Sequence, residues 1–404
     1  MFKRSLDLML VALVVLTGCS RGSQPEAEPA RPKQLDLLSY VSDDIYGVIV
    51  LHPQQIARSP EVAAMLKNEL FVAAFKGVGF DPLKIEQVLL LIPAPAKEPG
   101  LASDGPTAVL RFSPPLDAEN VAKGLLVKPL GPLGSINLVA ATVTVAGKKC
   151  YKFEEAAEEP AKTQTGGEPV RGKRFIPRMM TCVADDRTVL VSPRGEAGLK
   201  KMLAAGEVKT PLTERLRGLD VSDDVAAVFV LEPMREEVKA ALAREKRRSP
   251  TSPAISLDEI MLLLRSATFK ISLADAARSS VLLEAEDVAG AAKVEELLKT
   301  FRQVATDGLA GAPKRFQGMP EEFRKQIEEE TTTFEKLLDA MTSTRSGAQV
   351  TITLKGTEGL TGVAAVKAIS GMFTPVIIPS KPRPPGEGGL GEPGTKTSSL
   401  KAKR

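Results

Sequence analysis

Tryptophan is absent from this 404-residue chain, which also has only one histidine, three tyrosines and three cysteines. Aromatic residues make up 4% of the sequence, so there are few rings on which sugars or unpaired bases could stack. One histidine leaves little material for a zinc site or a Ser-His-Asp triad. These shortages argue against a carbohydrate-binding module, a single-strand-binding module and most histidine-dependent hydrolases.

A strong charge of either sign is also missing. The chain has 54 basic and 50 acidic residues, a net charge of +4, and 43% hydrophobic residues, as in an ordinary globular protein. Nucleic-acid binding would need a concentrated basic face, so we expect no nucleic-acid partner. The sequence contains no phosphate-binding P-loop, no Gly-x-Ser-x-Gly nucleophile elbow and no His-Glu-x-x-His helix. The length is sufficient for two domains.

The N-terminus has the order of an export signal. Lys3 and Arg4 precede an apolar run over residues 8–16, which Leu16-Thr17-Gly18-Cys19 closes. The run is much shorter than the ~20 apolar residues of a membrane-spanning helix, so it indicates a removable signal peptide. Its ending resembles a bacterial lipobox. The resemblance implies cleavage after residue 18, lipidation of Cys19 and attachment to the cell envelope. Ser20 follows the cysteine, and by the same resemblance this favours the outer membrane. An ordinary signal peptide with an incidental cysteine is the alternative.

Both ends of the mature chain are poor in core-forming residues. Residues 19–38 are largely polar and rich in proline and alanine, and we expect a lipidated N-terminus followed by a flexible tether. Residues 374–404 are rich in proline and glycine and end in basic residues, which predicts a disordered tail.

Between these ends, the sequence indicates an internal duplication. Val41–Pro53 aligns with Val221–Pro233 without gaps, and eight of the thirteen positions are identical. Shorter matches follow in the same order: Glu61–Leu66 with Glu237–Leu242, Glu86–Leu91 with Glu259–Leu264, Val109-Leu110 with Val281-Leu282, and Gly195–Leu199 with Gly356–Leu360. We therefore expect one copy over residues 39–206 and a second over residues 219–373.

Hydrophobic patterning predicts the same elements in both copies, in the order β-α-β-β-α followed by a closing β-α. This order favours an α+β fold, with mostly antiparallel sheets and helices on one face. The first copy adds strand-like insertions at 136–145, 148–153 and 179–184, and the second adds a helix at 321–341. The strands expected in the main pattern are 45–51, 87–92, 108–112, 188–192, 225–231, 268–273, 280–286 and 350–354.

Two cysteines remain besides Cys19. Cys150 and Cys182 lie in strand-like runs on either side of a polar loop centred near Gly166-Gly167. Folding back about that point would place them opposite each other on neighbouring antiparallel strands. In an oxidising envelope the pair is a candidate disulfide, and two buried free thiols are the alternative.

Few other residues offer chemistry. The Asp43-Asp44 and Asp223-Asp224 pairs could bind Ca²⁺ or act as acid and base, but neighbouring carboxylates in an extended chain point to opposite sides. A turn entering a strand is the simpler interpretation. His52, whose counterpart in the second copy is Glu232, is expected to be a solvated residue at a strand-to-helix turn. The basic run Arg244–Arg248 suits a helix C-terminus, with contact to anionic lipid or wall polymer as the alternative.

From the sequence alone we expect a cell-envelope lipoprotein whose body is a non-catalytic binding or scaffold module, with no catalytic residue, metal or cofactor. Its partners would be the membrane, through Cys19, and an unknown envelope protein or polymer. The alternative is an envelope hydrolase with a carboxylate-based site in the cleft between the two copies. The body resembles no characterised family.

Overall fold

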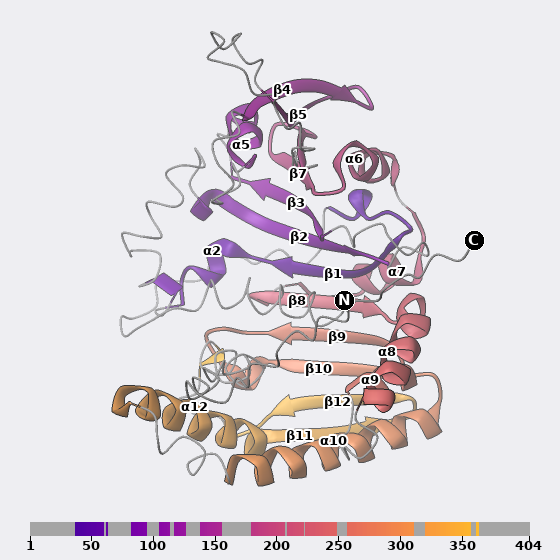
Figure 1. Ribbon diagram of the computed structural model, residues 1–404, viewed down its shortest axis with the longest axis vertical. Helices are drawn as coiled ribbons and strands as arrows, with labels where there is room; N and C mark the ends of the chain where they lie inside the picture. The colour runs from indigo at the N-terminus through magenta and orange to yellow at the C-terminus, as the bar shows by residue number, and fades with distance from the viewer. Residues whose placement is uncertain are drawn as a thin grey trace, which may run out of the picture.

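The architecture is that of one large sheet with helices packed on it (Figure 1). The computed structural model describes residues 37–59, 62–63, 82–94, 105–113, 117–126, 138–155, 179–206, 208–221, 223–248, 257–310, 320–356 and 361–362. Its sheet has 12 strands in the order β11-β12-β10-β9-β8-β1-β2-β3-β7-β6-β5-β4, and every neighbouring pair is antiparallel. The expectation of an antiparallel α+β fold is confirmed.

One half of the sheet comes from the N-terminal part of the chain. Runs rich in valine, isoleucine and leucine form its inner strands, because such side chains pack well on a pleated, buried surface. The strands of this half, from the centre outwards, are β1 (Ile45–Leu51), β2 (Ile85–Pro93), β3 (Thr107–Phe112), β7 (Thr188–Ser192), β6 (Met180–Val183), β5 (Lys148–Glu155) and β4 (Leu138–Val145).

The C-terminal part of the chain forms the other half. From the centre outwards its strands are β8 (Val225–Val230), β9 (Leu264–Ile271), β10 (Ser280–Ala285), β12 (Gln349–Leu354) and β11 (Met341–Ser346).

The two halves meet where β1 pairs with β8. Val48 lies opposite Val228, and the pairing continues over Gly47–Leu51 and Val225–Phe229. Every side chain of β1 is buried. A strand buried on both faces is apolar throughout rather than alternating, which is the pattern of Ile45–Leu51.

Helices cover both faces of the sheet, so the expectation of helices on one face is wrong. On β7, Val189 packs in one core cluster with Val121 of α5, whereas Leu190 packs in a second cluster with Leu199 of α6. Neighbouring residues of a strand point to opposite faces, so α5 and α6 lie on opposite sides. The helices are η1 (Leu38–Tyr40), α2 (Pro53–Ile56), η2 (Pro82–Lys84), α5 (Ala118–Gly124), α6 (Gly195–Ala204), α7 (Pro211–Arg217), η3 (Glu232–Met234), α8 (Arg235–Arg248), α9 (Leu257–Leu263), η4 (Ala276–Arg278), α10 (Val288–Ala310) and α12 (Glu321–Ala340).

One of the segment matches in the proposed duplication aligns a strand with a helix. Glu86–Leu91 lies in β2, but most of its matched segment, Glu259–Leu264, belongs to helix α9. Leucine, glutamate and methionine favour a helix, and Ile260 and Met261 are buried against the sheet. The strand that follows α9 was expected at residues 268–273. In the structure it is β9, which begins directly after the helix, at Leu264, and ends at Ile271.

The folded body reaches further towards the N-terminus than the expected tether boundary. Leu37 is 2% exposed, and both it and Val41 belong to the core cluster that contains α6. The signal peptide, Cys19, most of the tether and the C-terminal tail lie outside the described residues.

Cys150 on β5 lies directly opposite Cys182 on β6. Their Cα atoms are 4.0 Å apart and their sulfur atoms form a disulfide. Both side chains are fully buried. The polar loop between the two cysteines lies outside the described residues, but its flanking strands pair as the sequence suggested.

We predict that the chain carrying Cys19→Ala, unfolded without reductant, has no reactive thiol. A bridge spanning 32 residues contributes roughly 3–4 kcal/mol by restricting the unfolded chain, so reduction should lower the free energy of unfolding by about that amount. Thiol titration and urea unfolding measure the two quantities. Two reactive thiols before reduction would contradict the bridge.

A second prediction concerns the close approach at the centre of the sheet. A Cβ atom added to Gly47 would lie 2.5 Å from the Phe229 ring, which itself packs between Tyr46 and Phe269. We expect Gly47→Ala to destabilise the fold by about 1–3 kcal/mol, because the ring must shift within a packed core.

The matched control is Gly105→Ala, whose added Cβ would meet only Pro193 at 3.7 Å, an ordinary contact. Urea unfolding should show little loss of stability in this variant. In a Phe229→Ala background, the additional cost of Gly47→Ala should shrink. Equal effects at Gly47 and Gly105 would show that the β1–β8 contact is not tightly packed.

Candidate functional site

Polar side chains gather at both ends of the β1–β8 pair, where the two halves of the sheet meet. At one end, His52 follows β1 and is 1% exposed. Its backbone N–H donates to the Asp224 carbonyl at 3.1 Å. Its Nδ1 lies 3.0 Å from the Asp223 carbonyl oxygen, and its Nε2 lies 3.2 Å from Nε2 of Gln87. A neutral ring satisfies both contacts, since Nδ1–H donates to the carbonyl and Nε2 accepts from the amide.

The interpretation of His52 as a solvated residue is therefore wrong. The histidine is buried because β8 brings the Asp223-Asp224 turn against the end of β1, a contact between residues far apart in the sequence. Its role at this position is to hold the turn of one half against the strand end of the other.

The two aspartates of this turn have different environments. An Asp224 carboxylate oxygen accepts a 2.7 Å hydrogen bond from the Leu273 backbone N–H, which ties the turn to the end of β9. Burial raises the pKa of Asp223, although Lys270 and Arg278 oppose that effect. As expected, both aspartate pairs lie in turns that enter strands.

Asp44 lies at the opposite end of β1. Its carboxylate accepts hydrogen bonds from Ser42 at 2.5 Å, Lys201 at 2.8 Å and Arg194 at 2.9 Å. Burial opposes ionisation, but the hydrogen bonds from Lys201, Ser42 and Arg194 outweigh it and lower the pKa of Asp44 to about 2. This ion cluster attaches the region of α6 to the start of β1.

Sequence reasoning missed a third connection, made by α7. Arg215 of α7 forms a 2.5 Å ion pair with Glu284 of β10, and Ser266 of β9 donates to the same carboxylate at 3.1 Å. Burial alone would raise the pKa of Glu284. The hydrogen bonds from Arg215 and Ser266 and the charge of Arg215 together outweigh burial, so the pKa of Glu284 lies below its usual value. The sequence carries a helix-start signal here, because Thr210 caps α7 and Pro211 occupies the first helical position.

The candidate residues do not converge on one site. Asp44 and His52 lie at opposite ends of β1, about 26 Å apart by the rise of an extended strand. His52 meets Asp223 through the backbone carbonyl rather than the carboxylate. Between the two halves, where a cleft was considered, β1 and β8 form a continuous hydrogen-bonded ladder.

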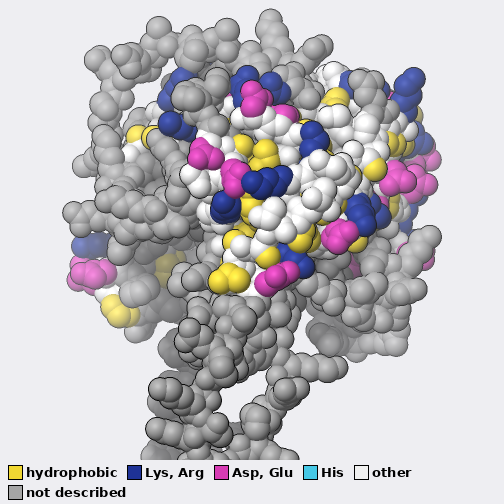
Figure 2. Space-filling view, turned by 90° about the horizontal axis from the view of Figure 1, so that it is seen from above, with side chains coloured by type: hydrophobic (Ala, Val, Ile, Leu, Met, Phe, Trp, Pro, Cys, Tyr) yellow, Lys and Arg dark blue, Asp and Glu magenta, His cyan; other side chains and the backbone are white. Residues whose placement is uncertain are grey.

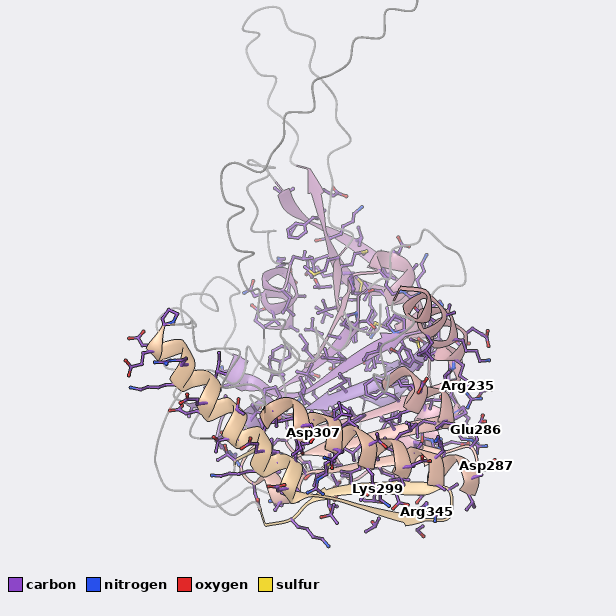
Figure 3. All side chains as sticks on the ribbon, turned by 60° about the horizontal axis from the view of Figure 1, so that its bottom comes forward. Arg235, Glu286, Asp287, Lys299, Asp307 and Arg345 are labelled. Carbon is purple, nitrogen blue, oxygen red and sulfur yellow. A yellow bond between two sulfur atoms is a disulfide. The ribbon has the colours of Figure 1, made fainter. Side chains whose placement is uncertain are left out.

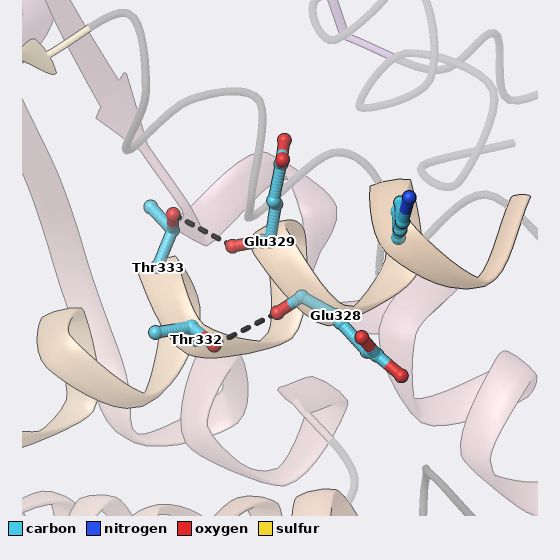
Figure 4. A pocket seen from close by; sticks show the side chains of 5 residues that line it. Glu328, Glu329, Thr332 and Thr333 are labelled. Atoms are coloured by element: carbon cyan, nitrogen blue, oxygen red, sulfur yellow. Dashed lines mark hydrogen bonds between the residues drawn. The ribbon is translucent and has the colours of Figure 1, made fainter. Parts of the chain in front are cut away.

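A hollow of about 500 Å³ lies elsewhere, on the surface of α12 (Figure 4). The described side chains that line it come from this helix. The Thr332 and Thr333 hydroxyls donate to the Glu328 and Glu329 carbonyls of the preceding turn, both at 2.8 Å. Among the described residues, the hollow therefore presents the flank of one helix only. Its lining residues are Lys325, Glu328, Glu329, Thr332 and Thr333.

Charges on the described surface are mixed in sign. Figure 2 shows basic and acidic side chains interspersed on the face seen from above. At the opposite end of the molecule, shown in Figure 3, Arg235 pairs with Glu286, and Glu295 pairs with both Lys299 and Arg345. Helix α8 reaches Arg248, as expected, but the side chains of the basic run Arg244–Arg248 lie outside the described residues.

Comparison with known proteins assigns no family. No family model matches the chain, and no curated protein matches it. Among solved structures, the chain is similar to one titled "Structure of crystal form I of TP0453", with 10% sequence identity and a TM-score of 0.38. That alignment covers 84% of this chain and 98% of the other. A similarity at this level does not define a shared activity.

We predict that Asp44→Asn lowers the free energy of unfolding by about 1–2 kcal/mol at neutral pH. The folded pKa of about 2 lies below the unfolded value of 3.8, so ionised Asp44 stabilises the fold fully above pH ~4. This contribution is lost as the pH falls through ~2.

The difference between wild type and Asp44→Asn should therefore shrink between about pH 4 and pH 2. Urea unfolding across that range measures it. Asp43→Asn is the matched control, because Asp43 is the exposed neighbour in the same turn, and it should have little effect. A pH-independent cost of Asp44→Asn would contradict the ion cluster as its cause.

Proposed function

We propose that this protein is a cell-envelope lipoprotein, anchored through lipidated Cys19 and facing the periplasm or the cell surface. The observation that carries the proposal is the N-terminal order of basic residues, apolar run and Leu16-Thr17-Gly18-Cys19. A short polar segment separates this signal from a body whose first described residue, Leu37, is already buried. Within the described residues, no helix has the length and apolarity needed to cross a membrane.

We further propose that the body consists of two copies of one unit. The strand order supports this, because β1-β2-β3-β7 leads outwards from the centre on one side and β8-β9-β10-β12 on the other. Val48 and Val228, which are equivalent in the sequence match, lie opposite each other. An antiparallel pair centred on equivalent residues is the arrangement that a two-fold relation between copies would produce.

The registers and the burial add support. Val48 pairs onwards with Leu91 of β2, and Val228 pairs onwards with Thr268 of β9. Val48, Val50, Val228 and Val230 all belong to the core cluster on one face, whereas Leu51 and Leu231 both belong to the cluster on the other. Equivalent side chains thus face equivalent directions. Where the sequence matches Glu86–Leu91 to Glu259–Leu264, the strand pairing instead makes Leu91 equivalent to Thr268.

In this proposal the body acts as a non-catalytic binding or scaffold module. The contacts of His52 favour such a role, because its ring and its backbone N–H meet the Asp223 and Asp224 carbonyls and hold the two halves together. Its partner would be an envelope protein or polymer, and the outer membrane is the favoured location. The proposal assigns no catalytic residue and no cofactor.

We predict that Cys19→Ala abolishes lipid attachment. Each buried methylene of an acyl chain contributes roughly 0.8 kcal/mol to membrane binding, so loss of the acylated cysteine removes the anchor. Incorporation of labelled fatty acid should disappear, and the protein should leave the detergent-extractable membrane fraction. The control carries Cys150→Ala and Cys182→Ala and should still be labelled. Equal labelling and membrane retention with and without Cys19 would refute the anchor.

A further inference from the structure

The outer edge of β4 ends the sheet without the features that normally protect an edge strand. β4 is the last strand on its side, and within the described residues only β5 pairs with it. Its sequence, LVAATVTV, contains no charge, no proline and no glycine, and Val139 is 47% exposed. Monomeric proteins usually interrupt such strands with lysine, proline or a bulge, because unpaired N–H and C=O groups recruit further strands.

The hairpin geometry shows which groups face outwards. Ala146 and Gly147 both have positive φ, 48° and 76°, as in a two-residue type I′ turn. The residues flanking such a turn, Val145 and Lys148, form a hydrogen-bonded pair. Because bonded and non-bonded pairs alternate, Thr144, Thr142 and Ala140 direct their N–H and C=O groups away from β5. β4 thus presents a regular row of donors and acceptors at its open side.

The strand at the opposite end of the sheet, β11, is charged and partly capped. Arg302 of α10 donates to the Met341 carbonyl at 3.3 Å, and Arg345 of β11 is held by Glu295 of α10. Figure 1 shows α10 and α12 beside β11, whereas β4 and β5 extend at the other end of the sheet. The chain therefore protects one edge with charge and leaves the other uncharged.

We propose that β4 pairs antiparallel with β4 of a second copy of this chain, so that the two 12-stranded sheets become continuous. The inference goes beyond the proposed lipoprotein function and does not require lipid on Cys19. An uncharged edge does not repel itself, and a two-fold axis brings the same residues of both copies together. Thr142 then lies at the centre, opposite Thr142 of the other copy.

The absence of charge on β4 favours a second copy as the occupant, because an uncharged strand does not repel an identical strand. The charged side chains of the hairpin lie on β5, where Lys149 pairs with Glu119 at 2.6 Å and Lys152 pairs with Glu154 at 2.8 Å, so they do not oppose the approach. A two-fold axis perpendicular to the sheet gives the antiparallel orientation. The chain already joins two strand edges in this way at β1–β8.

The direct test is Thr142→Pro in the full-length chain, purified from membranes in a non-ionic detergent. Proline removes the outward N–H and leaves the β4–β5 hydrogen bonds in place. Thr142→Ala keeps the N–H and is the matched control. We expect wild type and Thr142→Ala to have the mass of two chains by light scattering, after subtraction of detergent. Thr142→Pro should associate at least about tenfold more weakly, because each copy loses a hydrogen bond across the axis.

A crosslinking experiment keeps the test informative if the proline variant folds poorly. Thr142→Cys should form a disulfide-linked dimer under mild oxidation, seen on a non-reducing gel, because the two-fold axis places the cysteines opposite each other. Thr332→Cys, exposed on α12, should not. A single-chain mass for wild type throughout the micromolar range would overturn the proposal, as would equal crosslinking at both positions. A β4 edge that binds a different protein while the chain stays monomeric would also overturn it.

Discussion

The antiparallel pairing of β1 with β8 is the interaction on which the rest of the structure depends. These two strands lie within the sheet, and all the side chains of β1 are buried between helices and loops on both faces. Without this pairing, each half of the sheet would expose an apolar edge of unpaired backbone groups. The close approach of Phe229 to Gly47 shows how tightly the halves fit, because no larger residue has room at that position.

The buried polar groups around this pair fix its register. The backbone carbonyls of Asp223 and Asp224 meet the ring and the backbone N–H of His52 through contacts that only one alignment of β1 on β8 allows. A shift by one residue would also turn every apolar side chain of β1 to the opposite face. Leaving these polar groups buried but unpaired would cost about 1–3 kcal/mol each, so apolar and polar contacts select the same alignment.

Local sequence signals predicted the strands well and the long-range contacts poorly. Ile45–Leu51 and Thr188–Ser192 have the bounds that were expected, because β-branched runs bounded by turns depend little on distant neighbours. The segment 259–264 was matched to a strand of the first copy although most of it is helical, because a short apolar run does not distinguish a strand from a buried helix. His52 was placed in solvent because its burial depends on β8, which lies far along the chain.

The helices were misplaced for a related reason. The strands of the first half are apolar on both faces, as Val189 and Leu190 of β7 show, so they need cover on both sides. An antiparallel sheet with one covered face would instead alternate apolar and polar residues. That alternation is visible in β12 of the second half, where Thr351 and Thr353 point away from the face of Val350 and Ile352. The pattern in β7 was thus a signal for helices on both faces.

The two ends of the sheet set a limit on how the protein can associate. An edge strand extends a sheet wherever its backbone groups are open, and a protein with two open edges can form a filament of unlimited length. Within the part of the chain that the structure describes, Arg302 engages the Met341 carbonyl and Arg345 adds a charge to β11, whereas β4 has neither protection. A two-fold pairing through β4 would use the uncharged edge of each chain and leave a charged strand at both outer ends. The charge and the capped carbonyl of β11 would then oppose further extension of the sheet.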